Sequence, residues 1–501
     1  MFLSKFFYSP VIDQMNQTNI SRSFNTSIPN LSPKFASILQ AIFLFLIAPI
    51  PFQAMAANLT ASELTLWWCV PFAGILLSIA LCPLLIPKIW HKHTGKIILA
   101  WIIILLCPLY WQYGINISLH TVIHALLHEY LPFMLLLMAL YAISGGIVIK
   151  LNASGSTGLN ILLLTIGTLF AGIMGTTGAS MLLIRPLLRA NANRCHQAHV
   201  VIFFILLVGN IGGGLTPLGD PPLFLGFLKG VDFLWTIQHM LLPVLFNSLF
   251  LLILFYFVDR FYWCREPKKM NKTVNNNNSW QLYGKLNLVL LLAVISVVLL
   301  SGLSNNQTVW LFYGIELHLV ALVRDGLLAI ITLVAIFCTS SSLHQQNEFS
   351  WAPIQEVGKL FAGIFITISP VMLMLQAGAT GYFHPLVSLL QQQGNPDNPR
   401  YFWLSGVLSS FLDNAPTYLV FFNLAGGDAQ LLMHQFDATL LAISMGSVFM
   451  GALTYIGNAP NLMVKAIAEQ QSVRMPGFFA YMGWSFSLLI PLLMLDTLLF
   501  I

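Results

Sequence analysis

The segment GNIGGGLTPLGDPPLFLGF, residues 209–227, contains six glycines, three prolines and the carboxylate of Asp220 within an otherwise apolar run. A run of about 20 apolar residues is long enough to cross a bilayer as a helix. Glycine and proline interrupt helices, and a charged side chain inside a span costs about 3 kcal/mol on insertion scales. The segment therefore predicts a membrane helix that is broken near its middle, with Asp220 at the break as a functional candidate.

The composition of the chain is that of a membrane protein. Of its 501 residues, 57% are hydrophobic and only 8% are charged, and the mean hydropathy is +0.80. A soluble protein of this length carries roughly a quarter of its residues as charged side chains. We therefore predict an all-α polytopic membrane protein whose partner is the lipid bilayer. The net charge of +5 predicts no nucleic-acid partner, because basic residues beside spans normally report orientation.

The first 57 residues form a polar N-terminus followed by a targeting-like segment. Lys34 leads into the apolar stretch FASILQAIFLFLIAPIPFQAMAA, which ends in an A-x-A pattern at Ala54-Met55-Ala56. This layout is typical of a signal peptide, and an uncleaved first span that acts as a signal anchor is the alternative. Both interpretations place residue 58 outside the membrane.

Apolar runs in the rest of the chain predict about ten membrane-spanning helices. Two further runs, 159–188 and 402–425, are interrupted at their middles by GTTGAS and LDNAPT, and we expect each to form a re-entrant hairpin. The predicted spans lie near residues 67–87, 97–114, 131–149, 198–227, 238–259, 284–303, 324–339, 357–376, 438–467 and 478–501.

The basic residues support this topology. With residue 58 outside and both hairpins re-entrant, sixteen lysines and arginines face the cytoplasm and three, Lys229, Arg324 and Arg400, face out. Both ends of the mature chain are then outside a bacterial-type inner membrane. The sixteen are Lys88, Lys92, Lys96, Lys150, Arg185, Arg189, Arg194, Arg260, Arg265, Lys268, Lys269, Lys272, Lys285, Lys359, Lys465 and Arg474.

The chain contains an internal duplication. LTPLGDPPLF at 215–224 matches LTYIGNAPNL at 453–462 with an offset of 238, and the two hairpin centres are related by an offset of 237. We place the first repeat at 58–264, a polar cytoplasmic linker at 265–283 and the second repeat at 284–501. Because each half contains five spans, an odd number, the two copies run through the membrane in opposite directions.

Inverted repeats with discontinuous helices at matching positions point to a transporter binding site near the bilayer midplane. Each half supplies one hairpin tip and one broken helix, so four half-helix ends can converge. Their free carbonyls suit a cation, and their positive N-terminal ends suit an anion. Ordinary kinking of a membrane helix is the alternative for one such motif alone.

The polar residues at these breaks are the candidate ligands, and no catalytic residue is predicted. Asp413 lies at the second tip, where a carboxylate can hold either a proton or a small hard cation and so makes the two compete. A capping role on the following half-helix is the alternative for Asp413. Asn210, Asn423 and Asn461 are weaker candidates. The ion-binding candidates are Asp413, Asn414, Thr417, Thr176, Thr177, Ser180, Asp220, Thr216, Thr454 and Asn458, with Asp413, Asn414 and Asp220 as ligands of a transported sodium ion.

The motifs GNIGGGLTPLGDPPLF, FLDNAPTYLVFF and LTYIGNAPNLMV resemble the ion-transporter superfamily, in particular NhaD-type sodium/proton antiporters and the related arsenite and citrate carriers. The resemblance covers roughly residues 67–501. It implies an elevator-like carrier of two repeats, commonly a homodimer, whose hairpin tips and broken helices form the transport domain. By this likeness, seven of the candidates belong to the cation and proton site: Asp413, Asn414, Thr176, Thr177, Thr216, Asp220 and Asn458.

The expected function is exchange of sodium or lithium for protons by alternating access, with no cofactor. Dicarboxylate carriers of the superfamily typically show Ser-Asn-Thr at both tips, and this chain does not. A sodium- or proton-coupled carrier of citrate, dicarboxylate or arsenite-type anions is the alternative. A membrane-embedded non-transport protein is a second alternative. We expect no enzyme, since the sequence has no Walker motif or nucleophile elbow.

Overall fold

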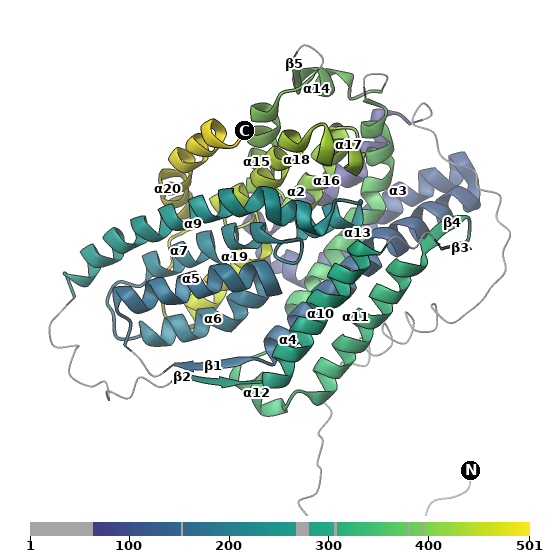
Figure 1. The fold of residues 1–501 in the computed structure, drawn as a ribbon. Helices are drawn as coiled ribbons and strands as arrows, with labels where there is room; N and C mark the ends of the chain where they lie inside the picture. Colours follow the sequence, from purple (N-terminus) through teal and green to yellow (C-terminus); the bar gives the residue numbers. More distant parts are fainter. Residues whose placement is uncertain (1–63, 152–153, 267–279, 305–307, 379–380, 393–394) are drawn as a thin grey trace, which may run out of the picture. The chain divides into compact units, whose positions relative to one another are not determined.

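The computed structural model describes residues 64–151, 154–266, 280–304, 308–378, 381–392 and 395–501 (Figure 1). The N-terminal targeting segment predicted within residues 1–57 lies outside the described residues, as does most of the predicted linker at 265–283. The first described residue is Leu64.

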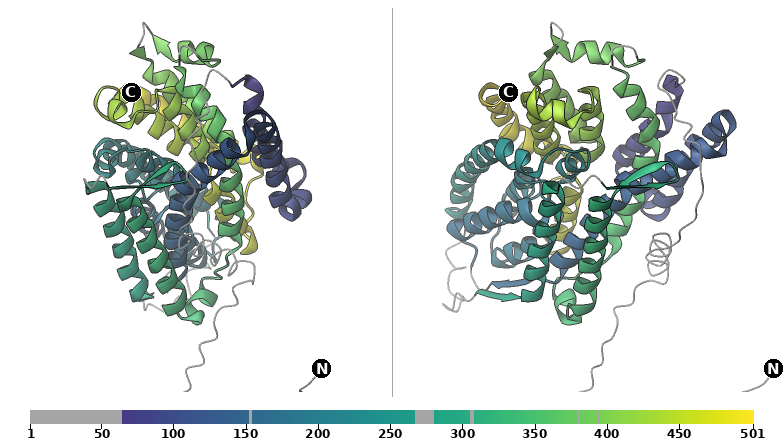
Figure 2. Two further views of the ribbon diagram at one scale, coloured as in Figure 1. Left: turned by 90° about the vertical axis from the view of Figure 1, so that its right-hand side faces the viewer. Right: turned by 45° about the vertical axis from the view of Figure 1, so that its right-hand side comes forward.

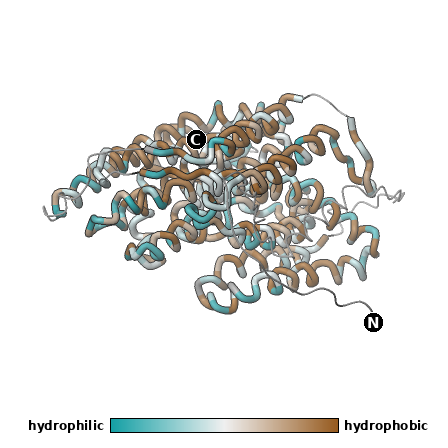
Figure 3. Tube along the Cα trace, turned by 90° about the horizontal axis from the view of Figure 1, so that it is seen from below, coloured by the Kyte–Doolittle hydropathy of each residue, from teal (hydrophilic) through white to brown (hydrophobic). Residues whose placement is uncertain are grey.

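The described residues are almost entirely helical, which confirms the all-α polytopic fold. Nine helical segments among them are long and apolar enough to cross a membrane. Many of their large apolar side chains are exposed, as a lipid environment permits; Leu242 and Phe257, for example, are 65% and 63% exposed. Figure 3 shows hydrophobic residues along most of these helices.

The long helices α2, α3, α4, α10, α11 and α13, together with the short η2 and η3, form a group separate from the hairpins and the broken helices. The predicted span 97–114 ends at an interruption of α3, because Gly114 has non-helical dihedral angles there, with φ at +82° and ψ at 176°. Glycine adopts this backbone conformation without steric cost. The bounds are η2 (Leu66–Cys69), α2 (Val70–Leu85), α3 (Pro87–His124), the π-helical η3 (Ala125–Tyr130), α4 (Leu131–Gly145), α10 (Lys285–Leu303), α11 (Leu319–Cys338) and α13 (Ala352–Gln376).

Two helical hairpins occupy the regions where re-entrant segments are predicted. In the first, α5 (Thr157–Met174) and α6 (Thr176–Ala190) are separated by Gly175 alone, with φ at +82°. In the second, α15 (Asn398–Phe411) and α16 (Asn414–Leu424) are separated by Leu412 and Asp413. The two arms of each hairpin pack against each other.

Two helices are broken, as the segment 209–227 and its repeat at 453–462 predict. The first consists of α7 (Ala198–Leu207), η4 (Ile211–Leu215) and α8 (Pro221–Leu228). The second consists of α18 (Asp437–Phe449), η7 (Met450–Leu453) and α19 (Ala459–Gln470). Prolines at the start of α8 and α19 suit the first turn of a helix, where the backbone N–H has no partner within the helix.

The structure fixes the register between the two halves. Helices α8 and α19 begin 459 − 221 = 238 residues apart, and α6 and α16 begin 414 − 176 = 238 residues apart. The offset of 237 for the hairpin tips is therefore wrong by one residue. Thr176 therefore corresponds to Asn414 and Gly175 to Asp413. The first arms of the hairpins keep the same offset, since Thr216 bonds the carbonyl of Gly172 and Thr454 that of Ser410, which is 410 − 172 = 238 residues further on.

The remaining elements complete the connections between these units (Figures 1 and 2). Helix α4 packs against α11, and α13 packs against α3, so each half of the chain contacts the other. The described residues also contain three two-stranded antiparallel ribbons that the sequence does not predict. They are β1 (Val148–Leu151) with β2 (Trp280–Tyr283), β3 (Val309–Phe312) with β4 (Ile315–His318), and β5 (Gln391–Gln392) with β6 (Asn395–Pro396). The other helices are α9 (Phe233–Trp263), α12 (Ser341–Gln346), α14 (His384–Leu389), α17 (Ala429–His434) and α20 (Phe478–Leu499).

The glycines at the breaks make contacts that no other residue can make. A Cβ at Gly219 would clash with the carbonyl oxygen of Gly213, and one at the corresponding Gly457 would lie 2.6 Å from the carbonyl oxygen of Gly451. Each break is thus folded tightly upon its own backbone.

We predict that Gly219→Ala lowers the free energy of unfolding by at least about 2 kcal/mol, because the clash is with backbone that cannot move aside. Thermal unfolding of the purified protein in detergent measures this. Gly158→Ala is the control: a Cβ there meets no described atom within 4 Å, and alanine favours helix α5. Equal melting temperatures for Gly219→Ala and wild type would contradict the close approach.

Candidate ion-binding site

Four helices begin at one cavity of about 100 Å³. The residues that precede helices α6, α8, α16 and α19 all line it: Gly175, Asp220, Asp413 and Asn458. With the offset of 238, Gly175 corresponds to Asp413 and Asp220 to Asn458, so each matched pair contains one carboxylate and one neutral residue. The N-terminal ends of helices carry partial positive charge, which stabilises both carboxylates.

Asp220 is the centre of the polar contacts at this cavity. Its side chain is buried, with 2% of the residue exposed. Thr176 Oγ1 donates to Asp220 Oδ1 at 3.1 Å, Asn458 Nδ2 to Oδ1 at 3.2 Å and Asn414 Nδ2 to Oδ2 at 2.5 Å. The three donors come from the first tip, the second tip and the second break, so Asp220 joins all four interrupted segments.

Two buried oxygen atoms on the hairpin arms α6 and α16 have no partner. Among the described residues, Asn414 Oδ1 and Ser180 Oγ are both buried and make no hydrogen bond. Leaving a buried polar atom unpaired costs about 1–3 kcal/mol. The other end of the Asn414 amide already bonds Asp220, so its free carbonyl oxygen is held beside a carboxylate. A carboxylate and an amide oxygen are ligands that hard cations prefer.

Asp413 lines the cavity from the second tip and also caps helix α16. Its Oδ1 accepts from the backbone N–H of Ala415 at 3.3 Å. The capping geometry that was the alternative for this residue is therefore present. Among the described residues, no hydrogen bond joins Asp413 to the Asp220 cluster. The structure therefore places Asp220 at the centre, although the sequence points first to Asp413.

An amide network connects the two breaks. Asn458 Nδ2 donates to Asn210 Oδ1 at 3.2 Å, and Asn210 Nδ2 donates to Asn461 Oδ1 at 2.8 Å. Asn461 Nδ2 in turn donates to the carbonyl oxygens of Gly451 and Thr454. The network satisfies backbone groups that the breaks release and holds Asn458 toward Asp220.

Thr216 and Thr454 hold the breaks against the hairpins. Thr216 Oγ1 donates to the carbonyl of Gly172 at 2.5 Å and accepts from the N–H of Leu218. Thr454 Oγ1 makes the matching bonds to the carbonyl of Ser410 and from the N–H of Ile456. Both hydroxyls are occupied by backbone partners, which favours a positioning role over direct ion ligation.

The other candidates differ in whether they line the cavity. Thr177 lines the cavity. Ser180, one turn further along α6, is fully buried and does not line it. Thr417 donates its hydroxyl to the backbone carbonyl of Asp413 at 3.0 Å, which fixes the tip. Of the weaker candidates, Asn423 accepts from Gln376 of α13 at 2.8 Å.

The opposite wall of the cavity is apolar and comes from α4 and α13. Phe133 and Phe361 contact each other with ring centroids 4.4 Å apart, and Leu140 and Ile354 extend the wall. The sequence does not reveal these residues, because an apolar side chain in a span carries no signal that separates a cavity wall from a lipid-facing surface. Among the described residues that line the cavity, none is lysine, arginine or histidine.

Comparison with known proteins gives a family for the chain. The sequence matches the family described as "Putative citrate transport" over residues 61–501, a range that includes both hairpins, both broken helices and the cavity. No curated protein matches the sequence.

We predict that Thr216→Val lowers the free energy of unfolding by about 1–3 kcal/mol, because a buried backbone carbonyl and an N–H group lose their partner. If Thr216 only positions the break, the apparent affinity for a transported cation stays unchanged in the protein that remains folded. Thermal unfolding and ion-dependent transport, measured on the same preparation, separate the two effects, and Ser487→Ala removes an exposed hydroxyl as the control. A large loss of cation affinity at unchanged stability would make Thr216 a ligand.

Proposed function

The chain belongs to this citrate transport family of membrane transporters, and on that premise we propose that it exchanges sodium or lithium ions for protons at the Asp220 cavity. The observation that carries the proposal is the unpartnered carbonyl oxygen of Asn414, whose amide nitrogen bonds the buried carboxylate of Asp220. Asp220 lines a cavity that has no basic side chain among its described lining residues.

A proton and a small cation satisfy the cavity in mutually exclusive ways. A cation binds the carboxylate oxygens of Asp220 together with neutral oxygens such as that of Asn414. A proton on Asp220 instead makes the carboxyl group a donor, and the amide of Asn414 can accept from it once its oxygen is turned toward Asp220. Since one form excludes the other, binding of sodium releases a proton. Asp413 supplies the second carboxylate at the same cavity.

Alternating access needs two states with the cavity open to opposite sides. We propose that the hairpins α5–α6 and α15–α16 and the two broken helices move as a unit against α4 and α13, which supply the apolar wall. The apolar wall itself has no polar bonds to exchange, whereas the hydrogen bond from Gln376 of α13 to Asn423 of α16 must break during this movement. In this proposal the carrier works as a homodimer in a bacterial-type inner membrane, with both ends of the mature chain outside.

A cation-coupled carrier of citrate is the second candidate. The family description favours it, and so do the four helix N-termini that meet at the cavity, because such ends attract carboxylates. Asp220 and Asp413, however, repel an anion unless cations bind with it. Citrate transport on this site therefore requires sodium or protons as well, and the same carboxylates would then bind the coupling ion.

We predict that sodium and lithium, but not citrate alone, collapse a pH gradient across proteoliposomes that contain the protein. Asp220→Asn and Asp413→Asn each abolish this response, because the asparagine amide cannot alternate between a proton and a cation. The measurement is the fluorescence of a pH-sensitive dye after addition of sodium, lithium, potassium or citrate.

Asp437→Asn is the matched control, since this exposed first residue of α18 does not line the cavity. Its Oδ1 accepts from the N–H of Ala438, which an asparagine oxygen can also do. The variant should transport as the wild type does. Uptake of labelled citrate that needs sodium, with no cation-driven proton movement in its absence, would contradict the antiporter and select the second candidate.

A further inference from the structure

A second cavity, of about 560 Å³, lies away from the Asp220 cavity at the beginning of helix α7. It is lined by the segment Arg194–His199, by Tyr262 near the end of α9 and by residues Ser472–Pro476, which connect α19 to α20. Its volume lies within the range of small-molecule sites in proteins. Its lining contains two arginines, Arg194 and Arg474, and two histidines, His196 and His199.

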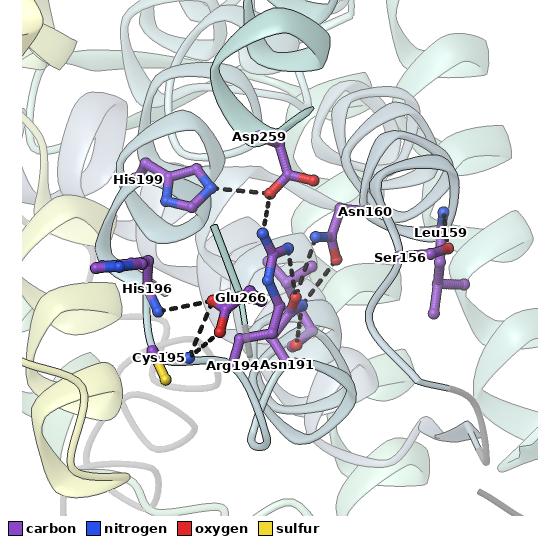
Figure 4. A network of polar contacts seen from close by, with 11 residues as sticks. Ser156, Leu159, Asn160, Asn191, Arg194, Cys195, His196, His199, Asp259 and Glu266 are labelled. Carbon is purple, nitrogen blue, oxygen red and sulfur yellow. Dashed lines mark hydrogen bonds and ion pairs between the residues drawn. The ribbon is translucent and has the colours of Figure 1, made fainter. Parts of the chain in front are cut away.

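Arg194 is a buried cation with unused donor capacity (Figure 4). Its side chain is 5% exposed, and Nη2 lies 2.7 Å from Asp259 Oδ1 while Nη1 donates to Asn191 Oδ1. His199 Nε2 lies 2.8 Å from the same carboxylate oxygen. The Nε atom of Arg194 is buried and has no hydrogen-bond partner among the described residues. Arg194 lines the cavity, so a guanidinium group that pairs with Asp259 and keeps one N–H unpartnered lies beside it.

The backbone beside Arg194 already binds a carboxylate of this chain. The N–H of Cys195 donates to both Glu266 oxygens at 3.0 Å, and the N–H of His196 donates to Glu266 Oε1 at 3.1 Å (Figure 4). Partial burial acts to raise the pKa of Glu266, but the two N–H groups outweigh it and the pKa lies below its usual value. Glu266 is therefore ionised at neutral pH, which shows that these N–H groups can bind a carboxylate.

We propose that this cavity binds a small di- or tricarboxylate, one carboxylate of which replaces Glu266 on the N–H groups of Cys195 and His196. A further carboxylate of the ligand then faces Arg474, and the free N–H of Arg194 supplies an additional donor. Glu266 acts as an internal competitor that occupies the carboxylate position when no ligand is bound. The proposal is independent of which ion the Asp220 cavity carries.

The test is isothermal titration of the purified full-length protein with citrate as the probe. Glu266→Ala removes the competitor and should lower the dissociation constant about tenfold, and Arg474→Gln should raise it about tenfold, since hydrogen bonds to charged groups are of that strength. Arg474 is exposed, so its substitution is not expected to disturb folding. Glu316→Ala, which removes an exposed carboxylate from β4, is the control and should leave binding unchanged.

Opposite shifts in the two variants distinguish a ligand site from a structural contact. If Glu266 only ties α9 to the loop before α7, Glu266→Ala lowers the melting temperature and leaves citrate binding unchanged, which overturns the proposal. Binding that is lost in Asp220→Asn and unaffected by Glu266→Ala and Arg474→Gln belongs to the Asp220 cavity and also overturns it. Binding of inorganic phosphate in place of citrate contradicts the carboxylate class.

Discussion

The two oxygens of Asp220 accept hydrogen bonds from Thr176, Asn414 and Asn458, which are 44, 194 and 238 residues away along the chain. A buried carboxylate is costly unless polar groups surround it, so these three donors must stay together for the fold to tolerate Asp220 at all. Because they come from both halves, the carboxylate ties the two repeats at one point. A change in its charge alters all three bonds at once.

The helix breaks and hairpin tips place these three donors within hydrogen-bonding distance of Asp220. A helix that crosses without interruption presents only side chains to the interior, whereas a broken helix also presents its free backbone ends. Gly219 and Gly457 let each break fold onto its own carbonyl groups, and Thr216 and Thr454 bond the broken segments to the hairpins. The N-termini of four helices then surround the cavity and offset the negative charge of two carboxylates.

The sequence predicted the local features of this site and missed the contacts between distant segments. Glycine and proline act on their own backbone, so GNIGGGLTPLGDPPLF and FLDNAPTYLVFF were sufficient to predict a break and a tip. The central position of Asp220 depends on Asn414 and Asn458, which are far away in sequence, and Asp413 therefore received the greater weight. The offset of the hairpin tips differs by one residue in the structure, because the polar residues of GTTGAS and LDNAPT do not mark where α6 and α16 begin. Phe133 and Phe361 were missed because their apolar character is shared with most residues of the spans.

The central claim is that a cation and a proton compete for the Asp220 carboxylate, and proton release on sodium binding tests it most directly. Purified protein in weakly buffered detergent solution is titrated with sodium chloride while a pH indicator reports free protons, with choline chloride as the ionic-strength control. The account predicts saturable acidification by sodium and lithium, and none with choline or in Asp220→Asn. Sodium binding detected by calorimetry without any release of protons would contradict it.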